Sequence, residues 1–223
     1  KYLQSNPLML IICISVFFIS VVDVFHILSY PGFVYFPNTL EPLNLTLSFW
    51  IFARIFQAVS ILFAILVSKY IKKVNYYLII VLFLLVTLFG ILFILQGFFP
   101  KMHDIDSGLT NTKIINEYII IILFFISGYL IVKHPLISNK NMMSIFITFL
   151  IFQMISEFFF TQYTSTSDNA FIIGHHFKIL SSLLIGYLLL KSTIIAPNRK
   201  LYNEILHQAD QLSKLLKYEK LTR

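Results

Sequence analysis

The sequence predicts an all-α fold, a polytopic transmembrane helical bundle of six spans followed by a cytoplasmic signalling helix. Of its 223 residues, 58% are hydrophobic and only 12% are charged, too few polar side chains to cover a soluble domain of this size. Most of its six apolar runs reach the roughly 20 residues that a helix needs to cross a bilayer. Helices are the expected form because lipid offers no partner to exposed backbone groups.

The six spans are expected to end at recognisable breaks in the sequence. The first stops before Tyr30-Pro31-Gly32 and the third before Pro100. The expected segments are residues 7–29, 45–68, 76–99, 118–132, 142–160 and 170–190. The fourth is short for a span unless it extends into its flanks. Because the composition turns polar after Pro197, we expect a transmembrane domain over 1–196 and a linker helix over 197–223.

Lysine and arginine gather in alternate loops, and this asymmetry sets the expected orientation. The loop after the second span holds Lys69, Lys72 and Lys73, and the C-terminal tail is also basic. The loop after the third span holds only Lys101 and Lys113, and the latter is balanced by Asp104, Asp106 and Glu117. The sequence therefore predicts a cytoplasmic C-terminus. The net charge of +7 is then a topology signal, so membrane lipid is an expected partner and nucleic acid is not.

Ionisable residues interrupt the apolar runs near the predicted outer ends of the spans. A charge inside a span costs about 2.5–3.5 kcal/mol on insertion scales and marks a functional site by default. The residues are Asp23, His26, Arg54, Glu157, His175 and Lys178, with Glu117 at a helix mouth. At 1.5 Å per residue, most of them lie roughly 6–13 Å below the outer boundary. Their similar depth predicts a single cluster in the outer leaflet.

Two interpretations of this cluster need no cofactor. In the first, it is an ion-pair network that sets the register of the helices, with Asp23 or Glu157 neutralising Arg54 or Lys178. In the second, it is a pocket that binds an unknown small ligand or ion and passes a signal on. The second is favoured because buried ions within a span usually mark function.

A metal or haem site is the third interpretation, with His26 and His175 as ligands from different helices. No HxxxH or CxxC spacing supports it, and the sequence holds neither GxSxG nor HExxH. An enzymatic activity is therefore not expected for this segment. His103 and His134 fall in predicted loops and are interpreted as solvated. His176 is interpreted as a packing or interfacial residue on another helix face.

Aromatic residues near the predicted outer boundary allow two interpretations. Trp50, Tyr30, Tyr35 and Tyr163 fit an interfacial belt, which is the favoured interpretation. Alternatively, one or two of them line the pocket. Gly174, which precedes His175, is expected to let two helices approach closely.

The polar tail repeats apolar residues at spacings of three and four. They are Tyr202, Ile205, Ala209, Leu212 and Leu216. This heptad pattern predicts a parallel dimeric coiled coil that leads into a further domain, and an amphipathic helix on the inner membrane surface is the alternative. The chain ends mid-helix without a stop signal, so we expect a longer protein.

Five ordered motifs carry a resemblance to a known family. The patterns are D-x-x-H-x-x-x-Y-x-G at 23–32, W-I-x-A-R within 49–54, G-L-T-x-x-K-x-x-x-E-Y at 108–118, S-E-x-x-F-x-x-Y at 156–163 and G-H-x-x-K-x-x-S at 174–181. In these motifs the chain resembles the third type of membrane-associated sensor domain. The resemblance covers essentially the whole chain up to the tail.

This resemblance implies a bacterial input module in the cytoplasmic membrane, coupled to a histidine kinase or a diguanylate cyclase. It also implies a seventh span before the six seen in this sequence, but neither a ligand nor a cofactor. Gln57 stands where the family usually has Glu, and Pro31 where it has Lys. The expected function is detection of a stimulus in the outer-leaflet pocket, with the last span passing it to an output domain. A haem- or metal-binding redox protein is the alternative.

Overall fold

Six helices of the computed structural model are long and apolar enough to cross a membrane, which confirms the predicted fold class. They are α1 (Pro7–Leu28), α2 (Pro42–Tyr70), α3 (Tyr76–Leu95), α4 (Asn111–Lys133), α5 (Lys140–Phe160) and α6 (Asn169–Leu190). The strands β1 (His103–Asp104) and β2 (Gly108–Leu109) form a small antiparallel hairpin between α3 and α4. The structure describes residues 6–33, 41–106, 108–133, 136–137, 139–163 and 167–222.

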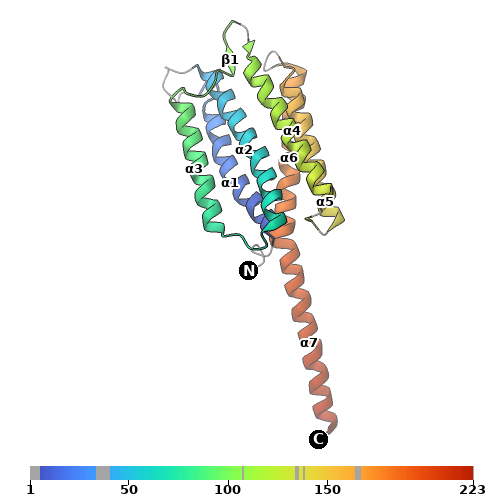
Figure 1. Cartoon of the computed structure of the whole chain (residues 1–223). Helices are drawn as coiled ribbons and strands as arrows, with labels where there is room; N and C mark the ends of the chain where they lie inside the picture. Colours follow the sequence, from blue (N-terminus) through green and yellow to red (C-terminus); the bar gives the residue numbers. More distant parts are fainter. Residues whose placement is uncertain are drawn as a thin grey trace.

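The helices form a bundle with α2 near its centre (Figure 1). On one side, α1 packs against α2 and α3. On the other side, α4 packs against both α2 and α5, and α5 packs along α6. Helix α1 begins at the same end of the bundle from which α7 leaves (Figure 1). We call the opposite end, where the β hairpin lies, the distal end.

Local sequence explains where several helices begin. Pro7 and Pro42 occupy the first helical turn, where proline removes no backbone hydrogen bond and its fixed φ suits the helix. Asn75 and Asn139 precede α3 and α5, and their side chains accept hydrogen bonds from the exposed amides of the first turn. These signals agree with the predicted starts of the first, third and fifth spans to within about three residues.

The fourth span is longer than predicted, because α4 begins at Asn111 rather than near Tyr118. The sequence of its first two turns is polar and was expected to belong to the outer loop. In the structure, Lys113 and Glu117 turn into the bundle and pair with each other, so the polar turns are helical and these two charges are buried. The fourth span therefore extends into its flank, and the predicted start near Tyr118 was wrong.

The last span continues into the tail without a break. Between α6 and α7 (Ala196–Thr222) lies a π-helical turn, Lys191–Ile195. Proline lacks an amide hydrogen and its ring clashes with the preceding helical turn, so a wider turn just before Pro197 accommodates it. Helix α7 extends away from the bundle, roughly in line with α6 (Figure 1). It does not fold back across the base of the bundle.

Candidate functional site

The charged residues of the spans meet near the distal half of the bundle. Arg54 is 1% exposed and forms an ion pair with Asp23, one of the pairings that the sequence left open, and this pair joins α2 to α1. Its Nη1 also donates to Gln57 Oε1 at 2.7 Å. Lys178 on α6 donates to the same Gln57 oxygen and to Gln153 Oε1 on α5, each at 3.1 Å. One amide oxygen thus connects the two cations across helices α2 and α6.

A second ion pair lies closer to the distal end. Lys113 Nζ and Glu117 Oε1 are 2.8 Å apart on α4, and both side chains are fully buried. The ammonium group also donates to the carbonyl oxygen of Phe160 and lies 4.5 Å from the centroid of the Tyr163 ring. The Lys113 ammonium group therefore has a carboxylate, a carbonyl and an aromatic ring as partners. Burial raises the pKa of the Tyr163 hydroxyl, so this group stays protonated.

Glu157 differs from the other carboxylates of the cluster. It is fully buried, and neither of its oxygens has a hydrogen-bond partner among the described residues. It forms no ion pair in that part of the chain either. The two ion pairs, together with Glu157 and Lys178, give three cations and three carboxylates in this region. They are Arg54, Lys113 and Lys178 with Asp23, Glu117 and Glu157.

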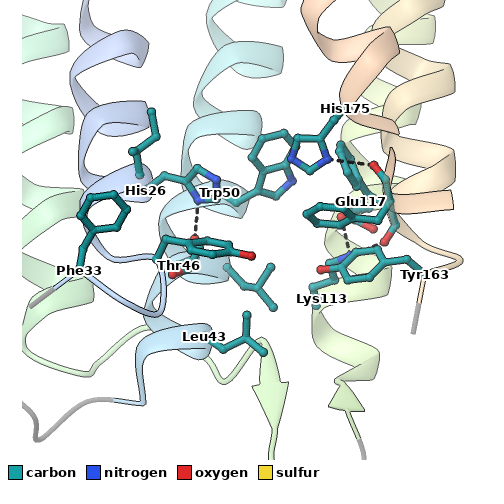
Figure 2. A pocket seen from close by; sticks show the side chains of 14 residues that line it. His26, Phe33, Leu43, Thr46, Trp50, Lys113, Glu117, Tyr163 and His175 are labelled. Atoms are coloured by element: carbon teal, nitrogen blue, oxygen red, sulfur yellow. Dashed lines mark hydrogen bonds and ion pairs between the residues drawn. The ribbon is translucent and has the colours of Figure 1, made fainter. Parts of the chain in front are cut away.

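A cavity of about 190 Å³ lies at the distal end, between helices α1, α2, α4 and α6 and the end of α5. Figure 2 shows Trp50 near its centre, His26 on the α1 side and His175 on the α6 side. Lys113, Glu117 and Tyr163 lie together on the wall nearest α4 (Figure 2). Most of the remaining wall is aromatic or aliphatic. We call this space the distal cavity.

Trp50 is a buried wall of this cavity and not part of an interfacial belt. It is 8% exposed, and its ring centroid lies 4.9 Å from that of Phe160. Tyr163, also 8% exposed, and the more exposed Tyr30 line the same space. The belt interpretation was therefore wrong for Trp50 and Tyr163. Tyr35 lies outside the described residues.

Both cavity histidines are held by backbone carbonyls. His26 Nδ1 lies 2.9 Å from the Thr46 oxygen of α2, and His175 Nδ1 lies 2.9 Å from the Phe171 oxygen of its own helix. A carbonyl can only accept, so each Nδ1 carries the hydrogen. In the neutral rings, each Nε2 then holds a lone pair. His103 instead contacts Glu41, and His134 lies outside the described residues.

The arrangement gives little support to a haem between the two histidines. The Trp50 ring lies between the imidazoles in Figure 2, with centroids 5.3 Å from His26 and 6.0 Å from His175. Axial ligation requires both imidazoles to face one iron across a flat macrocycle, and the indole occupies that space. Among the described residues, no group of three or more metal-binding side chains could hold a metal ion.

Comparison with known families identifies the kind of domain. The sequence model of MASE3, a membrane-associated sensor domain, matches residues 1–197. The chain belongs to the MASE3 family. No curated protein and no solved structure matches it. The family is defined by a sensory role and not a catalytic one, which fits the chain's lack of enzymatic motifs.

Within this MASE3 domain, the predicted site residues divide into two neighbouring sets. Those that line the distal cavity are His26, Tyr30, Trp50, Glu117 and His175. Those outside the cavity wall are Asp23, Arg54, Glu157 and Lys178. The Arg54 Cζ and Lys178 Nζ atoms lie 4.8 and 5.6 Å from the Trp50 ring centroid. The indole therefore contacts the cavity and is adjacent to the charged set.

Sequence reasoning missed several residues of this MASE3 site. Lys113 was assigned to the outer loop, although its spacing of four from Glu117 ahead of an apolar run could have indicated a helical ion pair. Gln57 and Gln153 are fully or almost fully buried and bind the Lys178 ammonium. Gln57 was noted only as a departure from the family's usual Glu. Phe160 is the phenylalanine of the S-E-x-x-F-x-x-Y motif, but it was not named as a site residue.

Gly174 brings α5 and α6 together behind the cavity, as predicted. Ser156 Oγ donates to the Gly174 carbonyl at 2.9 Å. A Cβ atom at position 174 would fall 2.8 Å from the Phe160 ring, which is too close for an ordinary contact. The absence of a side chain therefore lets the Phe160 ring approach α6 closely. Because Phe160 is also a cavity wall, this contact fixes one side of the site.

Proposed function

We propose that this MASE3 domain is the sensory input domain of a bacterial receptor, a histidine kinase or a diguanylate cyclase, and that the distal cavity receives its stimulus. One observation carries the proposal most strongly. The cavity wall includes α6, and α6 continues through a π-helical turn into the projecting helix α7. A change in packing around the cavity thus has a direct helical path out of the bundle.

The contacts of Trp50 suggest how such a change spreads. The indole lies against the cavity histidines on one side and near Arg54 and Lys178 on the other. Lys178 is one turn after His175 on α6 and is tied to α2 through Gln57. A shift of the indole therefore alters the link between α2 and α6. A stimulus drives this shift by favouring one packing arrangement over the other.

The remaining parts of the proposal concern surroundings and partners. The lysine-rich loops support a cytoplasmic α7, with the distal cavity in the outer leaflet of the bacterial cytoplasmic membrane. Exposed apolar side chains of the spans, such as the 69% exposed Phe89, face lipid. Helix α7 joins two copies of the chain as a parallel coiled coil. Ile205 and Leu212, both exposed, lie on its joining face.

The test is the output activity of the full-length receptor in membranes, normalised to the amount of inserted protein. We expect His26→Ala, Arg54→Ala, Glu157→Ala and His175→Ala each to lock or abolish the output while insertion continues. The reason is that each removes a cavity wall or a member of the adjacent charged set.

The matched controls are His103→Ala and His176→Ala, which change histidines outside the cavity. Both should leave the output near the parent level. If the four inner substitutions leave the response unchanged, the cluster has only a structural role. If they prevent insertion, an ion-pair network that sets helix register explains the cluster better than a signalling site does.

A further inference from the structure

We propose that the distal cavity binds an uncharged aromatic molecule that carries a hydroxyl group, a phenol or hydroquinone, with the Nε2 atoms of His26 and His175 as hydrogen-bond acceptors. This inference rests on the proposed function, because it names the class of ligand that the sensory cavity takes. Four features of the described residues support it: the size of the cavity, its walls, its charge and the tautomers of its histidines.

The size and walls suit a single substituted aromatic ring. An apolar cavity of about 150 Å³ is large enough to bind benzene. The distal cavity has a volume of about 190 Å³ and is walled by the rings of Trp50, Phe160 and Phe171. The His175 imidazole lies 4.9 Å from the Phe160 centroid and 4.2 Å from that of Phe171. Such surfaces favour offset or edge-to-face contact with another ring.

The charge of the walls disfavours an ionic ligand. The cation and anion of the cavity wall, Lys113 and Glu117, are paired with each other at 2.8 Å, and both are fully buried. Lys113 also donates to the Phe160 carbonyl, so its ammonium is not available to hold an anion. A charged ligand would therefore lose its hydration without gaining an unpaired partner.

The two histidines supply hydrogen-bond acceptors, their Nε2 atoms, at fixed positions in the cavity wall. Their Nδ1 atoms are used on the carbonyls of Thr46 and Phe171, so their Nε2 atoms carry lone pairs. No described residue donates to either Nε2, and both rings line the cavity. Two acceptors in an apolar, aromatic space select a ligand that donates, and a phenolic hydroxyl is the simplest donor on a flat ring.

Access from the membrane fits the same class. Helices α1 and α6 provide facing walls of the cavity but are not among the helix pairs that pack extensively in the described part of the chain. The wall on the α1 side includes Ile27 of α1, which is 58% exposed, and Phe33 just after this helix, which is 52% exposed. An uncharged aromatic molecule dissolves in lipid and can approach along this apolar face.

The test uses phenol and its methyl ether, anisole, as probes of similar shape with and without a donor. Trp50 is the only tryptophan of the chain, so its fluorescence reports on the cavity alone. In purified protein in nanodiscs, we expect phenol to change Trp50 emission saturably. Anisole should half-saturate at a concentration roughly ten times higher, the upper range for loss of one hydrogen bond.

The double variant His26→Phe/His175→Phe should lose the preference for phenol over anisole, whereas His103→Phe/His176→Phe should keep it. Equal half-saturation by the two probes in the parent chain, or no saturable change, overturns the inference without any variant. The outcome is separate from the proposed function. If receptor output depends on His26 and His175 but phenol does not bind, the sensory function stands and the proposed ligand class is rejected. If phenol binds with the expected preference but output does not depend on these histidines, the ligand class stands and the sensory role of the cavity is rejected.

Discussion

At the scale of single residues, Trp50 contacts both the apolar distal cavity and the buried charged residues. Its indole is a wall of the apolar cavity and lies within 4.8 Å of the Arg54 guanidinium carbon. The ring faces attract cations, which helps to stabilise a charge that is 1% exposed. Trp50 therefore lies between the cavity and the charged residues that connect α2 to α6.

The buried ion pair of α4 gives a prediction about stability. Glu117→Gln removes the partner of a fully buried lysine, so it should lower the free energy of unfolding by about 3 kcal/mol. The matched control is Glu41→Gln, which breaks the partly exposed pair with His103 and should cost less than about 1 kcal/mol. Unfolding in detergent checks both. Equal losses would show that burial does not set the strength of the Lys113 pair.

Some of these residues could be predicted from the sequence and others could not. That Arg54 pairs with a carboxylate follows from the rule that intramembrane charges need partners, but the choice of Asp23 over Glu157 does not. Trp50 could not be placed, because an aromatic residue near a span boundary fits both an interfacial belt and a cavity wall. Lys113 was missed because it was counted with Asp104 and Asp106 as part of a charged outer loop. Local sequence does not show which of these charges turns into the bundle.

At the scale of helices, the contact between α5 and α6 positions the wall of the cavity. Gly174→Ala places a Cβ 2.8 Å from the Phe160 ring, so we expect it to destabilise the domain by about 1–3 kcal/mol. It should also weaken binding at the cavity, because Phe160 is a wall residue.

The control for this prediction is Gly186→Ala on the same helix, where an added Cβ meets open space. It should leave stability unchanged or raise it slightly, since alanine favours a helix more than glycine does. Thermal unfolding of both variants in the same detergent makes the comparison. A larger loss at position 186 than at position 174 would refute the close approach at Gly174.

Helix α7 gives a second prediction at this scale. If the heptad face joins two copies, single cysteines at positions 205 and 212 should crosslink between chains more strongly than those at 207 and 214. All four positions are exposed, so access alone does not favour one pair. Crosslinking in membranes on a Cys13→Ser background makes the measurement. Equal or absent crosslinking at the four positions would support a helix without this partner.

The positions of the spans followed from the sequence more closely than their ends. Apolar length located all six, because crossing a membrane needs about 20 such residues. The start of α4 was missed because its first turns are polar and paired internally. The sequence led us to expect that the last span runs directly into the tail helix, as it does, but it did not predict the π-helical turn before Pro197.

At the scale of the whole molecule, the two ends of the bundle differ in charge and in structure. The end with α7 carries the lysine-rich loop around Lys72, and the distal end carries the hairpin and Asp106. The positive-inside rule then predicts that a membrane-impermeant thiol reagent added outside modifies cysteine at position 106 and spares position 72. Both positions are exposed. The reverse labelling would invert the proposed orientation and place the cavity in the inner leaflet.

The central claim is that a change at the distal cavity reaches the projecting helix α7 through α6. The most direct test is the distance between spin labels at positions 72 and 205 of one chain, measured by pulsed electron resonance in nanodiscs. The account predicts that His175→Ala shifts the distance distribution and that His176→Ala, its exposed neighbour on α6, leaves the distribution unchanged. Superimposable distributions for the parent and His175→Ala would contradict the claim.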